Sequence, residues 1–170
     1  MTLTTSYIKN NSDYYWKTID TVNNKKSNQI TFYIDTEGVS TTWHHSGDGI
    51  YDISAVSIPN FISTFINDSF ISLDKILDID FKRVYKSEDA IIKIIHTDMS
   101  SIPGMGDHSG AASSVYYGTY YDWSLGKWRA DDLSLEVIVK DDWIYNSTGK
   151  NNYFQEYLLL HEIGHLLTLE

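Results

Sequence analysis

The chain has 170 residues, of which 42% are hydrophobic and 21% charged, values typical of a single soluble folded domain. Its formal net charge of −10 argues against nucleic acid and an anionic membrane surface as partners, because both attract basic patches. The absence of cysteine excludes disulfides and thiolate metal sites. No apolar run approaches the roughly 18 residues that span a bilayer, and the N-terminal residues lack the basic and apolar regions of a cleavable signal peptide.

Residues 1–28 are mostly polar and are predicted to form an N-terminal arm ahead of one folded domain at residues 29–170. Within that domain, apolar residues alternate with polar ones over 29–35, which predicts a half-buried strand. The segment from residue 38 to residue 49 is bounded by glycines and is expected to be a loop. Its adjacent histidines, His44 and His45, are expected at the surface of that loop.

The spacing of the apolar residues changes after residue 57, and the new spacing predicts the first helix. Apolar side chains recur there at intervals of three and four residues, and Pro59 suits the first turn of a helix. Apolar residues between 73 and 77 extend the helix by one or two turns. The apolar positions of this pattern are Ile58, Phe61, Ile62, Phe65, Ile66, Leu73, Ile76 and Leu77.

Alternating or continuous apolar patterns return in the second half of the chain and predict four more strands. A long loop with Gly104, Gly106 and Gly110 separates two of them, and loops of this kind often carry function. The third of these strands is rich in aromatic residues and suits the edge of a sheet. The predicted strands are 79–85, 90–96, 113–121 and 133–140, with loops at 100–112 and 141–150.

The last predicted element is a helix over residues 153–167, with Asn152 as its N-cap and Gln155 at the third helical position. The chain therefore contains five predicted strands and two predicted helices. Their order predicts an α+β fold, close to α/β, in which a twisted mixed five-stranded sheet packs against both helices.

The C-terminal helix carries the sequence His161-Glu162-Ile163-Gly164-His165. Two histidines four residues apart lie on one face of a helix, where their imidazoles can hold one Zn²⁺. Glu162 lies about 100° round the helix, from where its carboxylate can act as general base toward a water molecule at the metal. The alternative without a metal is an amphipathic helix with two surface histidines and ordinary solvated glutamates.

This motif, with its glycine before the second histidine and the leucines after it, resembles the zinc helix of the metzincin metalloproteases, in particular their serralysin and matrixin-like branch. Upstream, residues 77–94 resemble the strand pair after the family's first helix, and residues 113–118 fall where its substrate-aligning edge strand would be. The resemblance implies that His161 and His165 bind zinc. It also implies that Glu162 activates water for peptide hydrolysis, that a protein or peptide substrate binds by β-addition, and that the protein is extracellular.

The family pattern continues with a turn glycine and a third zinc-binding histidine. Thr168 stands at the position of the glycine, and the histidine would fall one residue after Glu170. A catalytic zinc takes three protein ligands and keeps one position open, so the third ligand and the family's C-terminal subdomain are expected to be missing from this chain. The alternative to an active endopeptidase is a catalytically inactive metalloprotease-like domain that binds zinc or peptides weakly.

Two other groups of residues could bind a metal ion. His96, Asp98 and His108 resemble the structural-zinc loop of the matrixin branch, although their spacing favours a polar turn. The acidic pairs Asp131-Asp132 and Asp141-Asp142 could supply oxygen ligands for Ca²⁺. These pairs lack the alternating spacing of known calcium loops. Their side chains are therefore expected to be ordinary charged groups at the ends of strands.

Overall fold

The structure is a computed structural model of the chain, and it describes residues 29–45, 49–77, 80–124, 126–129, 132–140 and 152–167. The predicted N-terminal arm at 1–28 and the predicted loop at 141–150 lie outside the described residues.

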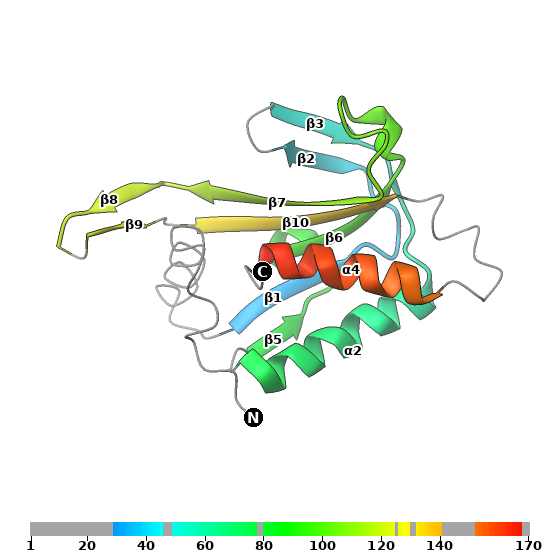
Figure 1. Cartoon of the computed structure of the whole chain (residues 1–170), viewed down its shortest axis with the longest axis horizontal. Helices are drawn as coiled ribbons and strands as arrows, with labels where there is room; N and C mark the ends of the chain where they lie inside the picture. Colours follow the sequence, from blue (N-terminus) through cyan, green and yellow to red (C-terminus); the bar gives the residue numbers. More distant parts are fainter. Residues whose placement is uncertain are drawn as a thin grey trace.

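A six-stranded mixed sheet forms the centre of the molecule (Figure 1). Its strands are β1 (Gln29–Ile34), β4 (Ala55–Val56), β5 (Asp80–Arg83), β6 (Ile92–Thr97), β7 (Gly110–Tyr117) and β10 (Asp132–Lys140). They follow the order β5-β1-β6-β10-β7, and short β4 pairs with the end of β6. The pairings β5-β1, β1-β6 and β6-β10 are parallel, whereas β7 runs antiparallel to β10 at the edge. The α+β class is therefore confirmed, with six strands instead of the predicted five.

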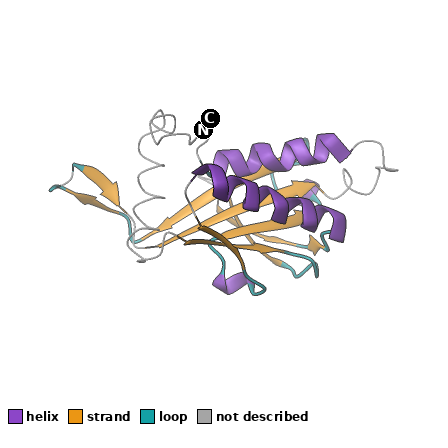
Figure 2. Cartoon of the chain, turned by 90° about the horizontal axis from the view of Figure 1, so that it is seen from below, coloured by secondary structure: helices purple, strands orange, loops and turns teal. Residues whose placement is uncertain are grey.

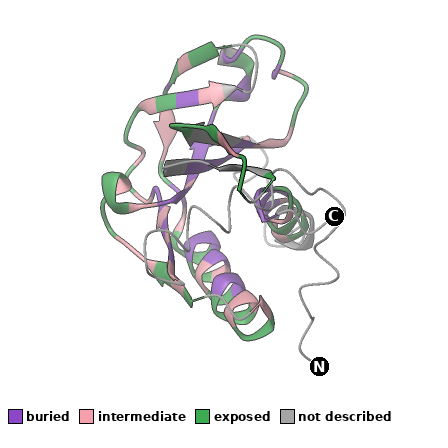
Figure 3. Ribbon diagram, turned by 90° about the vertical axis from the view of Figure 1, so that its left-hand side faces the viewer, coloured by how far each residue is buried: buried purple, intermediate pink, exposed green. Residues whose placement is uncertain are grey.

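Helices α2 (Asn60–Leu77) and α4 (Asn152–Leu166) pack against the same face of this sheet, as Figures 1 and 2 show. The first helix begins directly after Pro59, whose carbonyl accepts a hydrogen bond from the Ser63 amide at 3.0 Å. Its buried residues Ile62, Ile66 and Phe70 recur every four positions, and Figure 3 shows that α2 has one buried and one exposed side. Together with the apolar residues of β1, β6 and β10 they form the main core. α4 begins one residue before its predicted start, so Asn152 is already helical.

The opposite face of the sheet is covered in part by a hairpin that the sequence did not predict. The predicted loop 38–49 instead contains β2 (Thr41–His45), which pairs with β3 (Gly49–Ile53). The prediction failed because β2 has only one large apolar residue, Trp43, and therefore shows no alternating apolar pattern. The Trp43 side chain is fully buried. A second core surrounds it, with residues from β6, β10, the 3-10 helix η2 (Met99–Ser101) and the glycine loop.

His44 also differs from its prediction, because it belongs to β2 and is only partly exposed. Its backbone amide donates to Glu136 Oε2 at 3.2 Å, and its Nδ1 lies 3.5 Å from the same oxygen. Glu136 is 1% exposed, and its other carboxylate oxygen lies 3.7 Å from Lys93 Nζ. This buried carboxylate on β10 therefore fastens the hairpin to the sheet.

The predicted edge strand 113–121 is two strands. β7 starts three residues earlier, inside the predicted loop 100–112, and ends before Gly118, whose φ is 61°. The chain then continues into β8 (Tyr120–Asp122), which pairs with β9 (Lys127–Arg129). Figure 1 shows this ribbon extending β7 and β10 beyond the helices.

Candidate metal site on helix α4

The C-terminal half of α4 has one buried face and one exposed face. The buried face consists of Leu159, Glu162, Ile163, Leu166 and Leu167. His161 and His165 lie on the exposed face, with their Nε2 atoms 2.9 Å apart and their ring centroids 4.4 Å apart. The Tyr157 ring stacks beside His161 at a centroid distance of 6.1 Å. The structure thus brings the two predicted imidazoles together at the surface of the helix.

Glu162 lies on the buried side of α4 and is 7% exposed. Its side chain packs against the start of β7, where a Cβ atom on Gly110 would lie 3.2 Å from Glu162 Oε1. Burial raises the pKa of Glu162, while the nearby His165, His161 and His108 lower it in part. Because a carboxylate with a raised pKa binds a proton more readily, Glu162 is suited to general base catalysis.

The edge of the sheet lies next to this helix. α4 packs against β7 and β10, and in the described part of the chain β7 pairs with β10 alone. The outer edge of β7 therefore offers backbone donors and acceptors to a further strand. On the other face of the sheet, the Ser113 hydroxyl donates to the carbonyl of His44 and ties β7 to the hairpin.

The described residues contain no group of three histidine, aspartate or glutamate side chains placed to hold one metal ion. His161 and His165 are thus two adjacent imidazoles that could hold a metal ion, and no third such side chain joins them among these residues. Of the predicted calcium ligands, Asp131, Asp141 and Asp142 lie outside the described residues, and Asp132 is the first residue of β10.

The residues of the second predicted metal group are not brought together. His96 is fully buried within β6, whereas Asp98 is exposed and its carboxylate accepts a hydrogen bond from the Ser100 amide at 3.0 Å. This bond caps η2, as expected of a polar turn. His108 is exposed in the loop before β7 and contributes to the electrostatic environment of Glu162.

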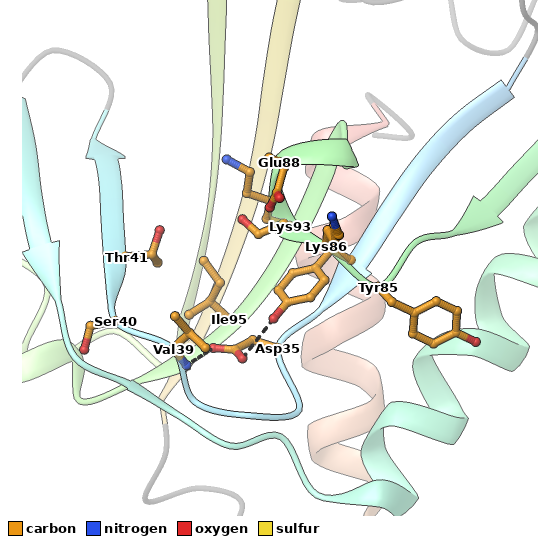
Figure 4. Close-up of a pocket in the computed structure, with 11 residues that line it drawn as sticks. Asp35, Val39, Ser40, Thr41, Tyr85, Lys86, Glu88, Lys93 and Ile95 are labelled. Carbon is orange, nitrogen blue, oxygen red and sulfur yellow. Dashed lines mark hydrogen bonds between the residues drawn. The ribbon is translucent and has the colours of Figure 1, made fainter.

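A cavity of about 380 Å³ lies on the sheet face that carries the hairpin (Figure 4). On its floor the Asp35 carboxylate accepts hydrogen bonds from the Tyr33 hydroxyl at 3.2 Å and from the amides of residues 37–39 at 2.9–3.2 Å. Burial and the Asp35 charge raise the pKa of Tyr33 to about 12. The cavity is lined by Tyr33, Asp35, Val39, Ser40, Thr41, Tyr85, Lys86, Ser87, Glu88, Lys93 and Ile95. Both charge signs are present, and both carboxylate oxygens of Asp35 are already paired within the protein.

Sequence reasoning missed this cavity and the contact between Gly110 and Glu162. The cavity residues come from β1, β2, β6, the 3-10 helix η1 (Ser87–Asp89) and two separate loops, and no periodic signal links them. In the sequence, Gly110 stands out only as a glycine shortly before a predicted strand. A glycine in a strand is a known sign of close backbone approach.

Comparison with known proteins gives no relative for this chain: no family model matches it, and no curated protein or solved structure matches significantly. No helix among the described residues is long and apolar enough to cross a membrane.

Proposed function

We propose that the protein is a zinc-dependent endopeptidase in which His161 and His165 bind the metal and Glu162 is the general base. The observation that carries the proposal is the convergence of the two Nε2 atoms, 2.9 Å apart, next to a buried glutamate on the same helix. α4 packs against β7, which among the described residues pairs with β10 alone, and this edge position supports the choice of an extended peptide as substrate.

The two histidines fit a zinc ion as part of its ligand set. Two nitrogens bound to one tetrahedral zinc at about 2.0–2.1 Å are about 3.3 Å apart. The Nε2 atoms at 2.9 Å need only a small rotation of either imidazole to reach that separation. Both side chains are exposed, and the His161 ring stacks beside that of Tyr157.

The bound metal would supply Lewis acidity, which polarises the substrate carbonyl and acidifies water. Glu162 would accept the proton of the attacking water at a carboxylate oxygen and pass it to the nitrogen of the leaving amine. The low exposure of Glu162 favours this role, because burial raises the affinity of the carboxylate for a proton. β7 would hold the substrate backbone by strand addition, which keeps the scissile bond in a fixed orientation.

The order of elements supports a metzincin-like form of this proposal. α2 lies between β1 and β5 in the chain, β7 is an antiparallel edge strand, and α4 follows β10, the neighbour of that edge. The alternative is an inactive domain of the same ancestry that binds zinc or peptide weakly. It is favoured by one observation, the lack of a third ligand among the described residues.

Zinc content and hydrolysis of an unfolded protein test the proposal together. The chain should retain one zinc per molecule after dialysis, and the Glu162→Gln variant should keep the metal while losing activity by at least about a hundredfold. The matched control is Glu156→Gln, on the same helix and more exposed than Glu162, which should leave activity unchanged. Zinc binding without hydrolysis would overturn the endopeptidase proposal, and so would a chain that neither binds zinc nor hydrolyses the substrate; in both cases the inactive alternative stands.

A further inference from the structure

The glycine at the start of β7 touches the carboxylate arm of Glu162. A Cβ atom built on Gly110 would lie 3.1 Å from Glu162 Cγ, 3.2 Å from Oε1 and 3.4 Å from Cδ. The two shorter separations are tighter than ordinary van der Waals contact. The backbone of Gly110 is not in the left-handed region, so the close contact with Glu162, and not the backbone conformation, disfavours a side chain at this position.

The strand cannot easily retreat from this contact. Gly110 is paired with Val139 of β10, and the preceding Ser109 carbonyl accepts a hydrogen bond from the Lys140 amide at 3.0 Å. Val139 is 1% exposed and belongs to the main core. A side chain at position 110 would therefore displace the Glu162 carboxylate and leave the strand in place.

We propose that Gly110 is a positioning residue for Glu162: the bare backbone of β7 fixes where the carboxylate of the general base lies. This inference rests on the proposed function. It adds that the base is set by direct contact with the first residue of the strand whose outer edge would bind the substrate. A methyl group at position 110 would shift the Glu162 side chain by a few tenths of an ångström. Misplacement of a catalytic group by about 1 Å can cost about a hundredfold in rate, so this contact should make a smaller contribution to turnover.

Gly110→Ala should lower kcat by about three- to tenfold, with KM and zinc affinity changed by less than about twofold. Zinc binding is spared because the contacts of a Cβ atom at position 110 are with Glu162 and not with either imidazole. The matched control is Gly106→Ala in the loop before the strand, where the nearest atom to a new Cβ, Ser100 Cα, is at an ordinary 3.8 Å. This control should leave kcat unchanged.

Glu162→Ala separates positioning from general damage to the strand, because it removes Cγ and the carboxylate, the atoms that the new methyl group at position 110 would contact. In the Glu162→Ala background, where the remaining rate does not depend on the carboxylate, adding Gly110→Ala should change kcat by less than about twofold. An equal loss in both backgrounds, or no loss in either, would overturn the inference and leave the endopeptidase proposal intact. If the unaltered chain neither binds zinc nor hydrolyses peptides, the proposed function fails, and the inference with it.

Folding provides a second readout. Should Gly110→Ala alone be unfolded, recovery of the folded chain on adding Glu162→Ala would support the contact, and continued failure to fold would overturn it.

Discussion

His96 is a fully buried histidine in the middle of the sheet, between Val56 of β4 and Val139 of β10. Neither of its ring nitrogens has a hydrogen-bond partner among the described residues. Burial lowers its pKa from 6.5 to about 4, because the surrounding apolar residues disfavour the charged imidazolium. A single residue therefore couples the stability of the sheet to pH.

The folded chain should lose stability as the pH falls from about 6.5 to about 4. In this window the unfolded chain binds a proton at His96 and the folded chain does not, so protonation favours unfolding. The shift corresponds to at most about 3 kcal/mol. His96→Leu, which fills a similar volume without a titrating group, should remove this part of the pH dependence in urea unfolding at several pH values. Parallel stability curves for the two chains would contradict the assignment.

The relative positions of His161, Glu162 and His165 depend in part on the geometry of helix α4 and in part on its packing. Helical periodicity alone places His161 and His165 on one face and Glu162 on another. The packing of α4 then decides what each face meets: solvent for the imidazoles, and β7 for the carboxylate.

At the scale of secondary-structure elements, α2 is fastened to the sheet by an aromatic cluster. Phe70 is fully buried, and its ring lies 4.1 Å from that of Phe32 on β1 and 5.1 Å from that of Phe81 on β5. Aromatic pairs at these distances add stabilisation beyond the area that they bury. The contact holds the helix across the outer two strands of the sheet.

Phe70→Ala should lower the free energy of unfolding by about 3–5 kcal/mol, because it leaves a cavity against two aromatic neighbours. Phe61→Ala is the matched control on the same helix, since Phe61 is 50% exposed, and it should cost less than about 1 kcal/mol. Urea unfolding followed by circular dichroism measures both. Equal losses for the two variants would show that α2 is not held by the face that the structure buries.

At the scale of the whole molecule, α4 joins the proposed metal site to the core of the fold. Leu159, Ile163 and Leu166 belong to the main core, and the two histidines are carried on the other side of the same turns. A ligand that needs both imidazoles binds only where this helix is formed. Metal binding should therefore stabilise the folded chain by mass action.

Zinc at about 100 times its dissociation constant should add about 2.7 kcal/mol to stability, or raise Tm by roughly 5–10 °C for a chain of this size. The increase should disappear in the His161→Ala/His165→Ala double variant. Calorimetry with and without zinc measures the effect, and His108→Ala serves as a control on an exposed histidine outside the proposed ligand pair. An unchanged response of the double variant to zinc would place the metal elsewhere.

Most of the regular elements could be predicted from the sequence, because their periodicity reflects a one-sided contact with a large core. The helix at Asn60–Leu77 and the strands β1, β5, β6 and β10 all fall within a few residues of their predicted ranges. The elements that were missed, β2, β3, β4 and β9, are short. Their stability depends on pairing and packing with other segments of the chain. Their own residues therefore show no periodic pattern of apolar side chains.

The sequence by itself determined the α+β class and the spacing of the two histidines and the glutamate, because both follow from local periodicity. Tertiary structure decided the order of the strands, the hairpin held by Glu136, and the contact between Gly110 and Glu162. These features join residues that are distant in the chain. The free energy that stabilises them comes from burial and backbone pairing, which exist only once the sheet has formed.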